Sequence, residues 1–138
     1  ELKEQTLSVE AEDGNLYCDL NWTAEALSNI LKNCMEHTPV GGEIRVMASV
    51  NTLFVEMKVR DSGAGIDKAD LPYIFDRFYR GKNAARDSVG IGLAMARAIT
   101  QAQGGSLEAR NAAAGVAEFI LRFPTVSPSA ATNPIAAK

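Results

Sequence analysis

Long hydrophobic runs, cysteine pairs and excess positive charge are what this sequence of 138 residues lacks. No apolar run reaches the roughly 20 residues that a bilayer-spanning helix needs, so we expect no membrane span. Two cysteines, Cys18 and Cys34, are too few for a disulfide framework, and we expect reduced core thiols in a cytoplasmic compartment. The net charge of −3 disfavours a general nucleic-acid-binding surface.

The remaining composition is that of an ordinary globular domain, with 46% hydrophobic and 22% charged residues. One shift in composition stands near the end, where residues 125–138 read TVSPSAATNPIAAK. This stretch is rich in alanine and proline and carries a single charge, which is typical of a disordered tail. We therefore predict one compact domain over residues 1–124 and a disordered tail over residues 125–138.

Hydrophobic periodicity predicts strands that alternate irregularly with helices. We expect strands over 6–10, 16–18, 44–50, 53–59, 106–111 and 116–123, and a short helix over 69–75. Long helices are expected from an Asp19 N-cap to about residue 36 and from Gly92 to Gly104-Gly105, with apolar stripes of Ala24, Leu27, Leu31, Cys34 and Met35, and of Met95, Ala98, Ile99 and Ala102. The pattern indicates an α/β two-layer sandwich (α+β), with helices on one face of a mixed, mostly antiparallel sheet.

Four polar residues recur every four positions along the first long helix: Glu25, Asn29, Asn33 and His37. This spacing places them on one ridge. A solvated helix face would explain one such asparagine, but two poor helix formers in mid-helix favour a site. An asparagine carboxamide oxygen suits Mg²⁺ that is held mainly by phosphate oxygens and water.

A glycine motif, Asp61-Ser-Gly63-Ala-Gly65, directly follows the second hairpin strand, so Asp61 is expected at a sheet end. Alone, the motif is explained equally well by a turn that needs positive φ. A carboxylate on a pocket floor can also accept a hydrogen bond from an exocyclic amine, and glycines allow the backbone to approach a flat ring. We interpret the motif as a base-binding loop.

The second long helix opens on Gly90-Ile91-Gly92-Leu93, which exposes backbone N–H groups where the helix dipole favours an anion. A flexible entry into the helix is the plain alternative. The stretch before it, residues 76–89, is locally basic and suits either polyphosphate or a solvated surface loop. Its cations and the aromatic residues at its entry are Arg77, Arg80, Lys82, Arg86, Phe75, Phe78 and Tyr79.

The order of these motifs resembles that of the catalytic and ATP-binding domain of sensor histidine kinases, in the GHKL ATPase superfamily. Residues 29–38 look like the N box, 61–65 like the G1 box, 75–80 like the F box and 90–93 like the G2 box. The ending, Phe119-Ile-Leu-Arg-Phe-Pro124, is similar to the last strand of that family. The resemblance covers roughly residues 6–124 and implies a Bergerat fold that binds ATP and Mg²⁺.

The resemblance also implies roles for individual residues. Asn33 would ligate Mg²⁺, Asn29 would support the phosphates and Asp61 would bind the adenine amino group. Arg80, Lys82 and Arg86 would belong to the ATP lid, and Asn29, Asn33, Arg80 and Arg86 would act in catalysis. The remaining nucleotide-binding residues would be His37, Gly63, Gly65, Ile66, Phe78, Tyr79, Gly90, Ile91, Gly92 and Leu93.

Three features depart from the family pattern. Glu36 stands where the N box often has a cation, and Ser88-Val89 replaces the Gly-Thr or Gly-Ser that usually precedes the last two glycines. The phosphoacceptor motif is absent, since the only histidine is His37, before Thr38-Pro39. The resemblance therefore implies that the accepting histidine lies on a separate dimerisation domain of the same parent kinase, with a response regulator downstream.

Further expectations follow from this resemblance. The parent would be anchored in the inner membrane, and this domain would be a cytoplasmic monomer that contacts neither membrane nor nucleic acid. Two other functions stay open: an ATP-hydrolysing conformational switch of the GHKL type, and a nucleotide-binding module without kinase activity. The hydrolysing relatives place a Glu base four residues before the Mg²⁺ asparagine, where this chain has Asn29, and an amide cannot accept the proton.

Overall fold

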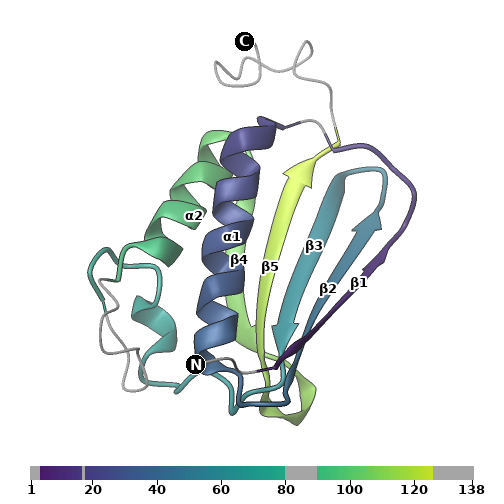
Figure 1. The fold of residues 1–138 in the computed structure, drawn as a ribbon. Coiled ribbons are helices and arrows are strands. Elements are labelled where there is room, and N and C mark those ends of the chain that lie inside the picture. The colour runs from purple at the N-terminus through teal and green to yellow at the C-terminus, as the bar shows by residue number, and fades with distance from the viewer. Residues whose placement is uncertain (1–3, 17, 80–89, 126–138) are drawn as a thin grey trace.

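A computed structural model describes residues 4–16, 18–79 and 90–125 of the chain. Two helices, α1 (Leu20–His37) and α2 (Gly92–Ala102), lie side by side on one face of a sheet (Figure 1). The five strands of the described part are β1 (Thr6–Ala11), β2 (Glu43–Val50), β3 (Phe54–Asp61), β4 (Ser106–Asn111) and β5 (Ala117–Pro124). This arrangement confirms the two-layer α/β sandwich.

The sheet has the strand order β1-β2-β3-β5-β4. Only β1 and β2 pair in parallel, and the other neighbours are antiparallel, so the sheet is mixed and mostly antiparallel as predicted. The β2–β3 hairpin turns where expected, because the Asn51 carboxamide oxygen accepts the backbone N–H groups of Leu53 and Phe54 at 2.7 and 2.9 Å. Thr125, which we had assigned to the tail, donates its backbone N–H to the Leu53 carbonyl.

Helix α1 begins as its sequence predicts. The Asp19 carboxylate accepts the backbone N–H of Trp22 at 3.0 Å, which caps the first turn. The helix ends at His37, shortly before Pro39, a residue that cannot continue it. No helix among the described residues is long and apolar enough to cross a bilayer.

The predicted apolar stripes of both helices are wrong in part. The residues that α1 buries are Thr23, Ala26, Ile30 and Cys34, whereas Ala24 is exposed and Met35 is 50% exposed. Helix α2 buries Ala96, Ile99 and Thr100, and Met95, Ala98 and Ala102 are exposed. The reason is that each helix packs against both the sheet and the other helix, so the most buried line lies between these contacts and favours small residues.

Two shorter predicted elements are also wrong. The expected strand over 16–18 is absent at Leu16 and Cys18, the two of its residues that the structure describes. This segment leads into the helix layer, where the Asp19 backbone N–H donates to the Gln103 side chain at 2.6 Å. The expected helix over 69–75 is reduced to one 3₁₀ turn, Leu71–Tyr73, because Pro72 has no backbone N–H to donate.

Candidate functional site

The candidate site lies at one end of the sheet, at the bottom of Figure 1, where α1 and β3 end. Asp61 is the last residue of β3 and continues the row of Val55 and Val59, both of which face the core. Because side chains alternate along a strand, the Asp61 carboxylate points into the helix layer. It is only 3% exposed, so the expected sheet-end carboxylate is present and buried.

The surroundings of Asp61 have opposing effects on the pKa of its carboxyl group. Burial raises the pKa of the Asp61 carboxyl above its ordinary value. The backbone N–H of Gly63, the positive form of His37 and the backbone N–H of Ala117 each act against that rise. The Gly63 N–H donates to the near carboxylate oxygen at 2.9 Å. The site therefore holds a desolvated carboxylate with partial compensation, which a ligand N–H donor would complement.

Cys34 lies next to this carboxylate, one turn before His37 on α1. Its side chain is fully buried, and burial together with the negative charge of Asp61 raises the pKa of the thiol well above its usual range. Both Cys18 and Cys34 are free, which agrees with the expected reduced thiols. The Cys34 thiol therefore stays protonated and serves as a compact neutral neighbour of Asp61.

The glycine loop after β3 is held against two other segments. A Cβ atom built on Gly63 would lie 2.3 Å from the His37 carbonyl oxygen, at the end of α1. One built on Gly65, whose φ is +85°, would lie 2.0 Å from the Gly115 carbonyl oxygen, in the β4–β5 connection. Neither position has room for a side chain, so both glycines are required by close backbone approach.

Asn111 fixes the far side of this loop and was missed by the sequence analysis. Its carboxamide oxygen accepts the Ile66 backbone N–H at 2.8 Å, and its amide donates to the Ile66 carbonyl at 2.8 Å. These two bonds pin residue 66 as a neighbouring strand would. The partners are 45 residues apart, so no local sequence pattern links them; an Asn at a strand end was the only signal.

The start of α2 faces the polar ridge of α1. A Cβ atom on Gly92 would lie 3.7 Å from Cβ of Asn29, which brings the first and third predicted motifs into contact. Ile91 is the N-cap residue and offers no side-chain hydrogen bond, so the first-turn N–H groups of α2 lack a side-chain cap. An anion held there would lie beside the Asn29 carboxamide.

These residues fit a nucleotide with its metal. Asn29, Asn33 and His37 are half-buried along one ridge, running from the α2 start toward Asp61. No cluster of three acidic, histidine or cysteine side chains able to hold a metal occurs in the part of the chain that the structure describes. Neutral carboxamides without such a cluster suit a cation that arrives with its own phosphate ligands. Leu93 and Ile66 pack partly buried against the core at this end.

The two ends of the basic stretch meet beside α2. The Phe78 backbone N–H donates to the Gly90 carbonyl at 2.7 Å, and a Cβ atom on Gly90 would lie 2.6 Å from the Tyr79 carbonyl oxygen. Phe78 is 63% exposed and has a φ of +68°, an unusual backbone conformation for a phenylalanine. Arg80, Lys82 and Arg86, together with Ser88-Val89, lie outside the described residues.

The Tyr79 side chain is held by the segment that precedes it. Its hydroxyl donates to the Asp70 carboxylate, and this bond raises the pKa of Tyr79 to about 12. The Tyr79 ring also packs against Tyr73, with ring centroids 5.6 Å apart. Tyr79 therefore anchors the chain where the described residues stop, and its role toward a nucleotide stays a prediction.

Residues 18–127 match the sequence family described as histidine kinase-, DNA gyrase B- and HSP90-like ATPases. The chain belongs to this ATPase family. It is 37% identical over 100 residues to the signal transduction histidine-protein kinase AfsQ2 of Streptomyces coelicolor, covering 71% of this chain and 18% of AfsQ2. It is 34% identical over 114 residues to the sensor protein CreC of Escherichia coli, covering 82% of this chain and 24% of CreC.

Solved structures give the same fold for this ATPase domain. The mycobacterial sensor histidine kinase MprB superposes with a TM-score of 0.80 at 23% identity, covering 88% of this chain and 84% of that chain. The catalytic domain of the histidine kinase ThkA gives a TM-score of 0.77 at 23% identity, covering 88% of this chain and 81% of that domain's chain. The Bergerat fold expected from the sequence is confirmed.

Proposed function

We propose that this chain binds Mg-ATP and donates the γ-phosphate to a histidine on a separate dimerisation domain, as the catalytic part of a two-component sensor kinase. One observation carries the proposal: the polar ridge of α1 connects the start of α2, which lacks a side-chain cap, with the buried Asp61 carboxylate at the end of the sheet. Base, metal and phosphate would each meet a suitable group there.

The base would be read by Asp61. Its carboxylate is nearly excluded from water and is oriented by the Gly63 N–H, so an exocyclic amine would gain a charge-assisted hydrogen bond. Gly63 and Gly65 keep the loop flat against its neighbours. His37, at the end of the ridge, would lie beside the base.

The phosphates would lie at the other end of the ridge. Backbone N–H groups of residues 90–93 and the dipole of α2 favour negative charge beside Asn29. Asn33 would hold Mg²⁺ through its carboxamide oxygen. The metal would neutralise charge on the transferring phosphoryl group, while the chain supplies position. Arg80, Lys82 and Arg86 are proposed to add cationic charge from the lid.

Phosphotransfer is favoured over hydrolysis by the residue at the position of the base in the hydrolysing relatives. Asn29 stands where a base for water would be needed, and Glu25, one turn earlier, is exposed. Glu36 is also exposed, and a carboxylate close to the triphosphate would be repelled, so it is proposed to turn outward. The isolated chain should therefore bind ATP and leave it intact.

The partner would be the histidine-bearing dimerisation domain of the same parent kinase, and a response regulator would receive the phosphate afterwards. The chain spans 18% of AfsQ2 and 24% of CreC, which leaves most of such a parent outside it. We propose that this domain works as a cytoplasmic monomer, within a parent anchored in the inner membrane, and contacts neither lipid nor nucleic acid.

The test is reconstitution. The chain is mixed with ATP, Mg²⁺ and the parent's dimerisation domain, and acid-labile phosphate on that domain is measured; Asn33→Ala is the loss-of-metal variant. We expect phosphate transfer by the unsubstituted chain and little transfer by the variant. ATP binding without transfer would instead indicate a binding module, and sustained hydrolysis near about 1 s⁻¹ or faster would indicate an ATPase switch, with Glu36→Gln as the next variant.

A further inference from the structure

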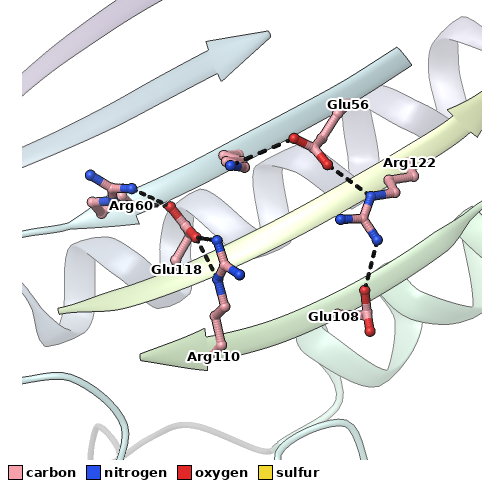
Figure 2. Close-up of polar contacts among 7 residues, drawn as sticks. Glu56, Arg60, Glu108, Arg110, Glu118 and Arg122 are labelled. Atoms are coloured by element: carbon pink, nitrogen blue, oxygen red, sulfur yellow. Dashed lines mark hydrogen bonds and ion pairs between the residues drawn. The ribbon is translucent and has the colours of Figure 1, made fainter. Parts of the chain in front are cut away.

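The sheet face opposite the helices carries two ion clusters, one centred on an acid and one on a base (Figure 2). The site-end cluster consists of Arg60, Glu118 and Arg110, with one acid between two bases. The far-end cluster consists of Glu56, Arg122 and Glu108, with Arg122 between the two acids, and Lys58 lies 3.6 Å from Glu56 as a second cation. Each spans the same three strands, β3, β5 and β4, and about 13 Å of strand separates Glu56 from Arg60.

The site-end cluster is unusually well satisfied. The Glu118 side chain is fully buried although neither α1 nor α2, the two α-helices of the described residues, covers this face. One of its oxygens accepts two N–H groups of Arg60 at 2.6 and 3.0 Å, and the other accepts from Arg110 at 2.8 Å. Burial alone would raise the pKa of Glu118, but the two arginines outweigh it and lower the pKa. Such forked bonds fix direction as well as distance.

Strand register places this cluster directly behind the site. Arg60 pairs with Glu118 across β3 and β5, and Arg110 pairs with Glu118 across β4 and β5. The next row along the sheet holds Asp61, Ala117 and Asn111, one residue away on each strand. Because neighbouring residues face opposite sides, each member of the cluster shares a peptide bond with a group of the site.

The three groups of that inner row are those that shape the base-binding end. Asp61 is the buried carboxylate, the Ala117 N–H opposes the rise of its pKa, and Asn111 pins Ile66. A change in twist or spacing of the three strands at this row would move all of them together. The far-end cluster lies behind core residues instead, since Val55 and Phe123 adjoin Glu56 and Arg122.

We propose that Arg60, Glu118 and Arg110 form a positioning cluster that sets base specificity by holding the Asp61 row in register from the opposite face of the sheet. The proposal rests on the proposed function, because it takes Asp61 as the reader of the adenine amine. It assigns no contact with the nucleotide to the cluster. The surrounding of a site commonly determines how well its contact residues are placed.

The experiment compares Glu118→Gln with Arg122→Gln, which neutralise the central charges of the two clusters. The first measurement needs no nucleotide: the amide NMR shift of Gly63, whose N–H donates to Asp61. We expect it to move in Glu118→Gln and to stay in Arg122→Gln. An unmoved Gly63 amide in a folded Glu118→Gln protein would overturn the proposal.

The second measurement is the preference for ATP over inosine triphosphate, in which a carbonyl oxygen replaces the exocyclic amine. Glu118→Gln should reduce that preference by about threefold to tenfold while Arg122→Gln leaves it unchanged. The same preference for ATP in both variants and in the unsubstituted chain would overturn the proposal. If the unsubstituted chain does not prefer ATP, the role of Asp61 is contradicted. The Gly63 amide shift would still report whether the cluster affects the Asp61 row.

Melting temperatures establish that each variant is folded. If Glu118→Gln does not fold, Arg110→Gln takes its place, because the Arg110 side chain is 55% exposed and its loss leaves the Arg60–Glu118 pair intact. Arg110→Lys keeps the charge but loses the fork, so it should restore part of the preference. A preference in Arg110→Gln equal to that of the parent would count against the cluster.

Discussion

The two ends of the sheet are stabilised in different ways. At the far end, the Asn51 carboxamide binds N–H groups two and three residues along the chain, and the turn is complete by itself. At the site end, the Asn111 carboxamide binds Ile66, 45 residues away, and Gly65 touches Gly115. The far end is therefore built from local contacts, whereas the site end is assembled from segments that meet only in the folded chain.

The two ends of the sheet also differ in whether they bury a charged side chain. The far end buries apolar side chains such as Val55 and Phe123, but the site end buries the Asp61 carboxylate, whose pKa is raised by that burial. A buried carboxylate opposes folding at neutral pH unless a ligand completes its hydrogen bonds. We conclude that the site end gives up stability for binding, and the following experiments test this conclusion.

The largest expected effect is that of Gly65→Ala. Its Cβ would lie 2.0 Å from the Gly115 carbonyl oxygen, so we expect a loss of about 3 kcal/mol or more in unfolding free energy. Gly41→Ala is the matched control, because Gly41 has a similar φ of +79° but nothing within 4 Å of its Cβ position. It should lose only about 1 kcal/mol, the cost of the left-handed conformation. Similar losses in urea unfolding would refute the close approach.

Asp61→Asn should separate binding from stability. We expect ATP affinity to fall by about 1.5–3 kcal/mol, since a charge-assisted hydrogen bond is lost. Unfolding of the nucleotide-free chain at neutral pH should occur at a higher temperature, because the buried charge is gone while an oxygen still accepts the Gly63 N–H. Calorimetry and thermal melts measure both, and unchanged ATP affinity would contradict the assignment of Asp61.

Asn111→Ala and Asn51→Ala test the long-range and the local turn. Each leaves two backbone groups without a partner, and each should cost about 1–2 kcal/mol of unfolding free energy. Only Asn111→Ala should also weaken ATP binding, by releasing the loop at Ile66. If Asn51→Ala weakens binding equally, the two ends are coupled and the comparison fails.

The smallest expected effect is in the pH dependence of unfolding, where Asp61 and Glu118 have opposite signs. The pKa of Glu118 is lowered by folding, so its contribution to stability is present above the unfolded value near about 4.3 and is lost as pH falls. The pKa of Asp61 is raised, so its contribution is favourable in acid and is lost as pH rises past about 3.9. Glu118→Gln should weaken the acid-induced loss of stability and Asp61→Asn should deepen it; identical profiles would show that neither shift matters.

Sequence reasoning predicted local features of the fold better than it predicted the buried faces of the helices. The Asp19 cap, the hairpin at Asn51 and the sheet-end position of Asp61 depend on neighbours along the chain, and their patterns are local. The buried face of α1 does not, because it depends on where α2 packs. A helix period identifies an apolar side, but two competing neighbours decide which line on it is buried.

The residues that sequence reasoning missed are those whose partners lie on other strands or loops of the same chain. Asn111 and Glu118 owe their roles to Ile66 and to Arg60 and Arg110, on other strands or loops. Arg60-Asp61 on β3 and Ala117-Glu118 on β5 are neighbours because of the strand order β3-β5-β4. The sequence around each pair does not show this. Their detection needed register, which one sequence does not determine.

The hydrogen bond between Phe78 and Gly90 has a consequence for how such domains diversify. The Phe78 N–H and the Gly90 carbonyl join the two described ends of this segment directly, so their pairing sets a short distance between those ends. Doubling the length of a closed loop costs only about 0.6 kcal/mol in entropy. Variants with more or fewer residues between Tyr79 and Gly90 should therefore differ little in unfolding free energy, so evolution can vary the length of this segment at small cost to stability.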